Sequence, residues 1–276
     1  MYKTKTYDEL TFADDYLFCR IMQDETICKG LIKTLLGIDA DRIEYLNQQQ
    51  TISPDYDAHG IRMDVFVKGT NEIYDLEMQT RHFDELPKRA RYYQSLVDLD
   101  TLDRNQDYRQ LKESFIIFIC TADPFGFSLP CYTVEQVCKE EPKASEKIND
   151  KTHKIYYNAT SWQKSENAEI RGFLKYLTTQ SADTDFTKAL QSAVRKSRKN
   201  ELWRKQFMTL QEMLNDVKAY GREEGIAIGE ERGRIETARN MIFDDLSFET
   251  ISKYTGLSIE AIQEIADETE AEKQPS

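Results

Sequence analysis

The sequence predicts an α/β protein in which a mixed sheet flanked by helices is followed by an all-helical C-terminal region. Helix-like and strand-like segments alternate from residue 14 to about residue 160, which is typical of a compact α/β domain. Beyond that point the apolar residues recur at helical spacing. With 276 residues, the chain is long enough to bury a sizeable core in one such domain and still carry a helical appendage.

Five segments define the predicted α/β domain. Apolar residues at helical spacing, with Gly37 as a stop, predict one or two helices between residues 14 and 36. Two strand-like runs, 61–68 and 73–79, flank the turn residues Gly69-Thr70-Asn71 and predict a hairpin. A helix is expected from Pro87 to Leu102, and buried or half-buried strands at 115–120 and 154–157.

Three regions are therefore expected along the chain. Residues 1–160 form the α/β domain, residues 161–245 form a helical region with a basic segment and a glycine-spaced helix, and residues 246–276 form a small helix-turn-helix-like element with an acidic tail. The second helix of that last element carries acidic side chains and no Lys or Arg, which is the wrong sign for entering a DNA groove. We interpret it as an interaction or packing element.

Composition restricts the classes of protein. The net charge of −12 argues against a protein that holds nucleic acid by bulk electrostatics, so any phosphate-binding surface must concentrate its positive charge locally. The five cysteines contain no C-x-x-C pair, which favours a reducing, cytoplasmic compartment. No run of about 18 apolar residues occurs, so neither secretion nor membrane insertion is expected.

Two features of the helical region allow alternative interpretations. The densest positive charge lies at residues 195–199 and 204–205, and it is either a solvated helix face or a phosphate-contacting surface. Glycine recurs at Gly221, Gly225, Gly229 and Gly233, and each costs roughly 0.8–1 kcal/mol relative to alanine inside a helix. We favour close packing of a second helix, which predicts a homodimer through the C-terminal helices; the alternative is a frayed linker helix.

The hairpin carries the candidate chemistry. Because side chains alternate along a strand, Asp75, Glu77 and Gln79 share one face of the second strand and Asp64 lies on the corresponding face of the first. A Gly69-Thr70 loop would set Asp64 opposite Asp75, whereas a loop that also takes in Asn71 and Glu72 would set Asp64 opposite Glu77. Both registers gather carboxylates.

Like charges across a strand pair are destabilising unless something compensates them. Oxygen-rich carboxylate clusters are what Mg²⁺ and Mn²⁺ prefer, so one interpretation is a divalent metal site. The other is a set of ordinary solvent-facing acids on a two-faced hairpin, with Arg62 as the compensating charge. The three histidines are scattered without zinc-ligand spacing, and no phosphate-loop or serine-histidine signature is present.

The motif of Asp64, a short hairpin and Glu77-Met78-Gln79 resembles the PD-(D/E)XK nuclease superfamily, with Gln79 in the place of the commoner lysine. Together with the segments 11–18 and 89–93, it is similar to the transposase-like, recombination-promoting branch of these nucleases. The resemblance covers residues 10 to 160. It implies a restriction-endonuclease-like fold and Mg²⁺-dependent hydrolysis of DNA phosphodiester bonds, with Mn²⁺ as a substitute.

The resemblance also implies roles for individual residues. Asp64 and Glu77 would be metal ligands, joined by the backbone carbonyl of Met78 and by an acid from the opening helix, for which Asp15 is favoured over its neighbour Asp14. Gln79 would orient the attacking water or a phosphate oxygen, but it supplies no positive charge. The residues expected to contact substrate or to neutralise the transition state are Arg62, Lys88, Arg89, Arg91 and Tyr92.

Two functions follow from these expectations. The first is a DNA endonuclease in recombination, transposon-like mobility or defence against foreign DNA, acting in the cytoplasm on DNA as a homodimer. The alternative is a nuclease-fold module that binds DNA or protein with weak or no catalysis. Divalent metal binding at the hairpin distinguishes them.

Overall fold

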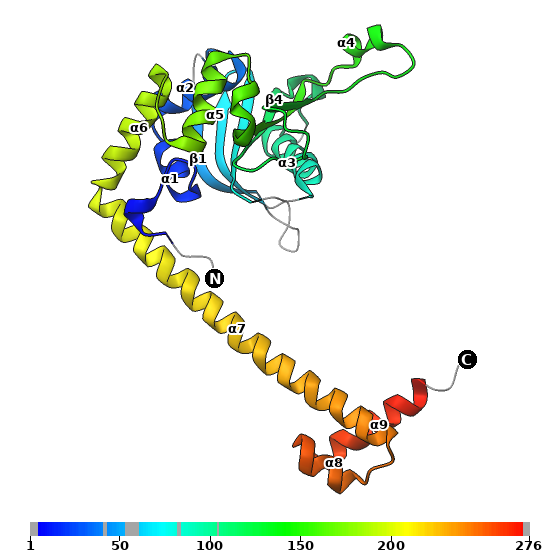
Figure 1. Ribbon diagram of the computed structural model, residues 1–276. Coiled ribbons are helices and arrows are strands. Elements are labelled where there is room, and N and C mark those ends of the chain that lie inside the picture. The colour runs from blue at the N-terminus through cyan, green and yellow to red at the C-terminus, as the bar shows by residue number, and fades with distance from the viewer. Residues whose placement is uncertain (1–4, 41–42, 53–60, 82–83, 104, 273–276) are drawn as a thin grey trace. The chain divides into compact units, whose positions relative to one another are not determined.

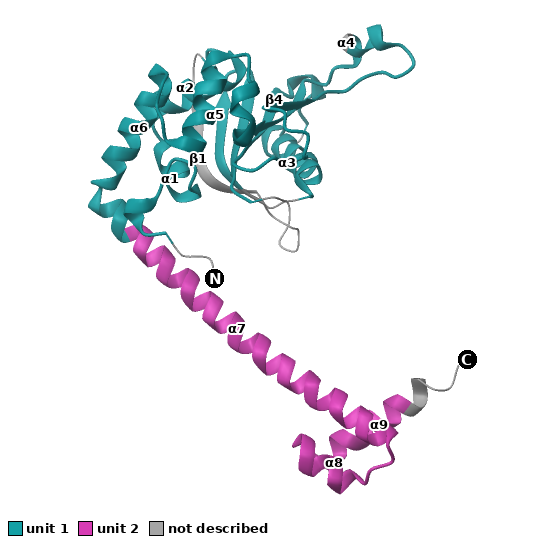
Figure 2. Ribbon diagram, viewed as in Figure 1, with its two compact units in different colours: residues 1–205 teal, residues 206–276 magenta. Residues whose placement is uncertain are grey.

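The computed structural model describes residues 5–40, 43–52, 61–81, 84–103 and 105–272; for 44–52, 61–62, 146 and 270–272 it describes the backbone only. The chain divides into two compact units, residues 1–205 and 206–276 (Figure 2). The first contains a mixed sheet with helices around it, as the sequence predicts, and the second is helical. No helix within the described ranges is both long and apolar enough to cross a bilayer.

The sheet has six strands in the order β1-β2-β3-β4-β6-β5. The strands are β1 (Ile43–Ile52), β2 (Ile61–Gly69), β3 (Glu72–Gln79), β4 (Glu113–Cys120), β5 (Cys131–Val134) and β6 (Thr152–Asn158). The pairs β3–β4 and β4–β6 are parallel, and the pairs β1–β2, β2–β3 and β5–β6 are antiparallel. The predicted hairpin and both later strands are confirmed, while β1 and β5 were not predicted.

Helices occupy both sides of this sheet (Figure 1). α3 (Leu86–Thr101) connects the parallel strands β3 and β4, as such a crossover requires, and begins with Pro87 in its first turn. Its apolar side packs with Phe66, Ile116, Phe118 and Tyr156 in one buried cluster. Tyr157, which alternation turns to the other face, donates a hydrogen bond to the carbonyl of Leu35.

On the opposite side lie helices from both ends of the first unit, which also pack on one another. These are α1 (Asp15–Ile21), α2 (Glu25–Leu36), α5 (Ala168–Thr179) and α6 (Asp185–Arg198). Gly30 in α2 lies against the ring of Phe186 in α6, where an added Cβ would be only 2.8 Å from the ring. Gly172 in α5 is packed more tightly still, because an added Cβ would be 2.4 Å from Cγ2 of Thr184. Both glycines allow α5 and α6 to approach the rest of the unit closely.

Caps set the two ends of α2, of which the sequence predicted the one at Gly37. The Asp24 side chain accepts hydrogen bonds from the backbone N–H groups of Thr26 and Ile27 at the start of α2, and Gly37 ends this helix in the left-handed conformation. A short arm with η3 (Pro142–Ala144) and α4 (Ser145–Ile148) joins β5 to β6. The remaining 3₁₀ turns are η1 (Tyr7–Glu9), η2 (Tyr108–Gln110) and η4 (Ala159–Lys164).

The second unit contains most of α7 (Glu201–Phe243), with α8 (Phe248–Thr255) and α9 (Ile259–Glu272). Ala238 of α7 packs with Ile251, Ile262 and Ile265 in a small buried cluster. The predicted turn is confirmed at Gly256, which has a φ of 73°, and Ser258 accepts a hydrogen bond from the N–H of Ala261 at the start of α9.

Candidate active site

The β2–β3 hairpin has the second of the two registers considered from the sequence. Val65 pairs with Leu76 and Phe66 with Asp75, so the same register sets Asp64 opposite Glu77. The link between the strands is Thr70-Asn71, which makes a Gly69-Thr70 loop and an Asp64–Asp75 pair wrong. The two registers differ by two residues and therefore keep the same side chains on each face, so the alternation of apolar residues alone could not choose between them.

Backbone hydrogen bonds hold the two facing carboxylates. The N–H of Asp64 donates to Oε1 of Glu77 at 2.9 Å, and the N–H of Met78 donates to Oδ2 of Asp64 at 3.0 Å. Each carboxylate is therefore tied to the backbone of the opposite strand. This reciprocal bonding fixes the orientation of both side chains before any ligand binds.

The acidic face of β3 is buried. Asp75 is 0 % and Glu77 4 % exposed, and Gln79 is also buried, because α3 covers this face with Leu86, Tyr93 and neighbouring apolar residues. The interpretation of these residues as solvent-facing acids is therefore wrong. A two-faced strand pattern does not reveal that α3, the helix that follows β3 in the chain, packs over its polar side.

Burial makes ionisation of these carboxyl groups unfavourable. It raises the pKa of Asp64 to about 9, with smaller contributions from the neighbouring charges of Glu77 and Asp15. Burial likewise raises the pKa of Glu77, and the charge of Asp75 adds to the effect. Neither oxygen of Asp75 has a hydrogen-bond donor within the described chain. A hydrogen bond between the carboxyl groups of Asp75 and Glu77 can form only when one of the two carries a proton.

A second cluster of possible ligands joins Asp64 to α1. One ligand atom each from Asp15, Cys19 and Asp64 lies within 4.8 Å of the others. Asp14 is engaged elsewhere, because its carboxylate accepts hydrogen bonds from Thr11 and pairs with Lys5 at 2.7 Å. Of the two adjacent acids, Asp15 is therefore the one that the structure brings to Asp64.

Arg89 on α3 is the cation beside the buried acids. Its guanidinium lies 3.7 Å from Oε2 of Glu77 and donates to Oε1 of Gln79 at 3.0 Å and to the Tyr93 hydroxyl at 2.9 Å. Gln79 in turn donates to the carbonyl of Arg81. Gln79 is thus held from both ends of its amide, and the positive charge that it lacks stands next to it on Arg89.

The other predicted substrate contacts lie outside this buried network. Lys88, Arg91 and Tyr92 are exposed on α3. Arg62 belongs to β2, but its side chain is outside the described part of the structure. The structure therefore joins Arg89 to the acids and leaves the remaining α3 residues at the surface.

Cys19 was not predicted from the sequence. It is buried, its thiol lies 3.5 Å from Oδ1 of Asp15, and burial raises its pKa, so the free thiol stays protonated near neutral pH. Its spacing from Asp15 is i, i+4 on one helix, which places both side chains on the same helix face. That spacing is the signal that could have identified it.

The donor set fits a divalent cation. Carboxylate oxygens from Asp15 and Asp64 converge beside a third acid, Glu77, and burial together with the neighbouring carboxyl groups raises the pKa of both Asp64 and Glu77. Hard cations such as Mg²⁺ bind oxygen donors and offset this repulsion. The thiol of Cys19 is the one donor of the cluster that a hard cation does not favour.

Comparison with known proteins supplies an independent result. The family model described as PD-(D/E)XK nuclease family transposase matches residues 12–224, which is more than half of the chain and includes β2, β3 and α3. Neither the curated proteins nor the solved structures gave a match.

Proposed function

The chain belongs to the PD-(D/E)XK nuclease family transposases, and from this premise we propose that it is a Mg²⁺-dependent DNA endonuclease of the recombination-promoting branch. It hydrolyses phosphodiester bonds in recombination, transposon-like mobility or defence against foreign DNA. The observation that carries this proposal is the pair Asp64–Glu77, oriented by reciprocal backbone hydrogen bonds and joined by Asp15 from α1.

Asp64 and Asp15 would hold the metal, together with Glu77 and the backbone carbonyl of Met78. A divalent cation supplies Lewis-acid polarisation of the phosphate and a water molecule of lowered pKa, and Mn²⁺ is expected to substitute for Mg²⁺. The chain's own contribution is orientation, because the N–H groups of Asp64 and Met78 fix the two strand carboxylates. Metal binding must release the protons that burial keeps on these groups.

Gln79 and Arg89 together would replace the lysine that nucleases of this superfamily commonly have at the position of Gln79. Gln79 offers an amide that orients the attacking water or a phosphate oxygen, and Arg89, 3.0 Å from that amide, supplies the positive charge. Lys88, Arg91 and Tyr92 on the exposed side of α3, together with Arg62, would contact the DNA beyond the reacting phosphate.

A plasmid-nicking assay tests this proposal. Wild-type protein should convert supercoiled to nicked plasmid with Mg²⁺ and lose this activity with EDTA, whereas Asp64→Ala should be inactive in both conditions. Asp14→Ala is the matched control, because Asp14 is the adjacent acid on the same segment but pairs with Lys5. Binding of DNA without Mg²⁺-dependent cleavage would instead favour the alternative, a catalytically weak or inactive nuclease-fold binding module.

We further propose that the protein acts as a homodimer through its C-terminal helices. The four glycines of α7 have open space where a Cβ would lie, so a second helix could approach this stripe closely. Two subunits would bring two sites to one duplex, which suits cutting both strands. A monomer in sedimentation experiments at micromolar concentration would contradict this assembly.

A further inference from the structure

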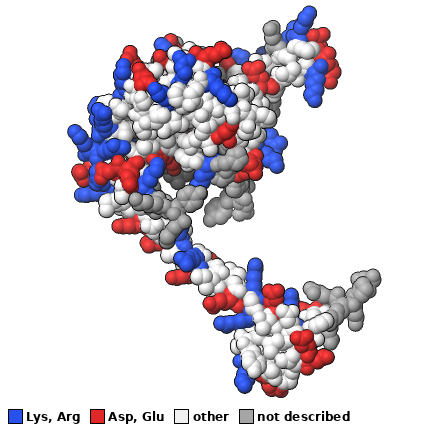
Figure 3. All heavy atoms as spheres, in the orientation of Figure 1, with Lys and Arg blue, Asp and Glu red and all other residues white. Residues whose placement is uncertain are grey.

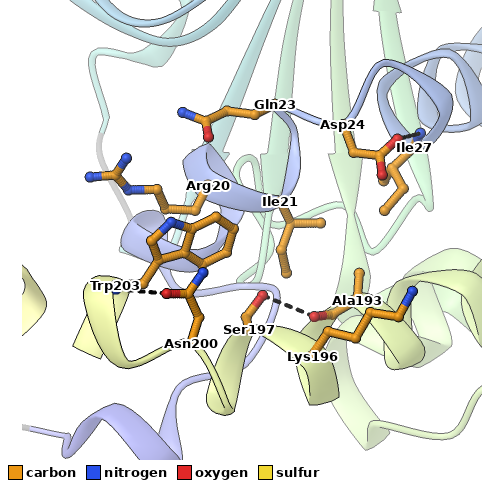
Figure 4. Close-up of a pocket in the computed structure, with 10 residues that line it drawn as sticks. All are labelled: Arg20, Ile21, Gln23, Asp24, Ile27, Ala193, Lys196, Ser197, Asn200 and Trp203. Atoms are coloured by element: carbon orange, nitrogen blue, oxygen red, sulfur yellow. Dashed lines mark hydrogen bonds between the residues drawn. The ribbon is translucent and has the colours of Figure 1, made fainter.

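A cavity of about 300 Å³ opens on the first unit where the end of α1 and the start of α2 face α6 and the start of α7. Figure 4 shows Arg20, Trp203 and Lys196 around it. The carboxyl groups of Asp64, Asp75 and Glu77 do not line it. At the lower end of the roughly 300–1,000 Å³ range of ligand pockets, it suits a ligand of nucleotide size or smaller.

The aromatic wall of this cavity is fixed in place. The backbone N–H of Trp203 donates to Oδ1 of Asn200 at 3.1 Å, and the Tyr16 hydroxyl donates to the Trp203 carbonyl at 2.8 Å. One residue further on, Arg204 pairs with both carboxylate oxygens of Asp8 at 2.8 Å. The backbone that carries the indole is therefore anchored to two separate parts of the unit, which lowers the entropic cost of stacking a ligand on it.

The other walls combine apolar and cationic groups. Ile21 and Ile27 supply apolar surface, Arg20 lies with its guanidinium carbon 6.0 Å from the Trp203 ring centroid, and Lys196 is exposed. The acid at the rim, Asp24, is already engaged as the cap of α2, where two backbone N–H groups donate to it. A flat aromatic wall beside two cations matches a planar base joined to a phosphate better than it matches an apolar ligand.

The surface around the cavity is also positively charged. Arg195 and Lys199 are exposed beside Lys196 at the C-terminal end of α6, and Figure 3 shows Lys and Arg side chains gathered over this helix. The guanidinium of Arg198, by contrast, donates a hydrogen bond to the backbone carbonyl of Leu10 and so stabilises the packing of the first unit. An acidic protein that handles DNA must concentrate cations locally, and this end of α6 is such a place.

The cavity also lies close to the candidate active site along the chain. Arg20 follows Asp15 by five residues in α1, which corresponds to a rise of about 7.5 Å. The same five residues also turn the helix by about 140°, so the two side chains leave α1 in different directions and a DNA strand that occupies both sites would have to pass around this helix.

We propose that this cavity is a nucleotide subsite in which an unpaired base stacks on Trp203 and its phosphate lies between Arg20 and Lys196. The proposal rests on the proposed nuclease function and deepens it, because it assigns single-stranded or unstacked DNA as the part of the substrate that enters. The same chemistry would also accept a free nucleotide, and the test separates the two sources.

The chain has only two tryptophans, so Trp203 can be observed alone in a Trp162→Phe variant. This variant, carrying Asp64→Ala to prevent cleavage, is titrated without metal with a short single-stranded oligonucleotide, the matching duplex and dAMP. We expect saturable quenching of Trp203 by the single strand at lower concentration than by the duplex. Stronger quenching by dAMP than by the oligonucleotide would assign the cavity to free nucleotides and overturn its role in DNA binding.

Two substitutions test the residues. Trp203→Leu should weaken single-strand binding, followed by fluorescence anisotropy of a labelled strand, by about tenfold. Lys196→Gln should weaken it and reduce its salt dependence, whereas Lys188→Gln, an equal charge change at another exposed position of α6, should not. Lys196 forms no ion pair with any described residue, so its replacement leaves the fold intact even if Trp203→Leu is unstable.

Saturating single-strand binding without any change in Trp203 fluorescence, or equal effects of the Lys196 and Lys188 variants, would overturn the subsite. Because these titrations contain no metal, their failure leaves Mg²⁺-dependent nicking untouched. Conversely, a protein that quenches as expected but nicks no plasmid would retain the subsite and lose the proposed endonuclease activity.

Discussion

The acidic face of β3 and the glycine-spaced part of α7 both contain residues that are unfavourable where they stand. On β3, Asp75 and Glu77 are buried as neighbouring acids. On α7, four glycines interrupt a helix that is exposed over most of its length. The first cost is partly offset inside the chain, because Glu77 accepts a hydrogen bond from the N–H of Asp64 and lies 3.7 Å from Arg89. The second is not, since nothing lies within 4 Å of any of these glycines' Cβ positions.

This difference matches the two different ligands that we propose, a cation for the β3 face and a second helix for α7. The β3 face is enclosed and organised, so a small cation can complete it without rearranging the fold. The α7 stripe is open, and only a surface as long as the stripe can complete it. Gly30 and Gly172 show the packed case in the same chain, because the space that their missing side chains leave is filled by Phe186 and Thr184.

The largest expected effect is on the β3 side. Glu77→Gln keeps the shape of the side chain but cannot ionise to bind a cation, and Mg²⁺-dependent nicking should fall more than about 100-fold, since even residues that only support a metal ligand contribute 10–100-fold. The melting temperature of the metal-free variant should stay equal or rise slightly, because a neutral amide replaces a buried carboxyl group whose ionisation is unfavourable. Wild-type nicking rates in the variant would remove Glu77 from the site.

The second largest effect on the nicking rate is expected from substitutions of Gln79. Gln79→Ala should lower the nicking rate by about tenfold or more, because it removes the amide that Arg89 holds, whereas Gln79→Lys should remain active or improve. Single-turnover nicking rates at saturating Mg²⁺ measure both. If both variants cleave like the wild type, Gln79 takes no part in the chemistry.

Protons should compete with the metal at Asp64. Its pKa is about 9 in the folded protein and 3.8 in the unfolded chain. Between these two pH values the folded state keeps a proton on Asp64 that the unfolded state has released. The metal-free protein should therefore lose stability as pH rises from about 4 towards 9, and metal affinity should rise by up to about tenfold per pH unit.

Thermal unfolding at pH 5 and pH 8 checks this dependence, with Asp64→Asn as the variant. The substitution removes the titrating group, so the decrease in melting temperature between the two pH values should become smaller. An unchanged decrease would show that other groups carry the pH dependence.

The smallest effect is expected on α7. Replacing Gly225 and Gly229 by leucine should shift a dimer towards monomer and lower double-strand breaks several-fold while changing single nicks little, because each site hydrolyses one bond at a time. Sedimentation velocity and the ratio of linear to nicked plasmid measure the two results. Gly37→Leu is not a suitable control, because that glycine has a φ of 72°.

The sequence by itself determined the local features of the site. Alternation along residues 73–79 was enough to put Asp75, Glu77 and Gln79 on one face, and the helix stop at Gly37 was readable because a left-handed glycine cap depends on the local backbone alone. The strand β1 escaped prediction because its run of Asn and Gln at 47–50 has no alternation. Pairing with β2, rather than local preference, makes it a strand.

Only the tertiary structure decided burial and proximity. Nothing local indicates that α3 covers the acidic face, that Arg89 reaches Glu77, or that Asp15 rather than Asp14 meets Asp64. The cavity beside Trp203 exists because residues about 180 positions apart, Arg20 and Trp203, come together. Packing between distant segments sets which side chains lose water, and with it their pKa values and their use in binding, so these properties cannot be read from spacing along the chain.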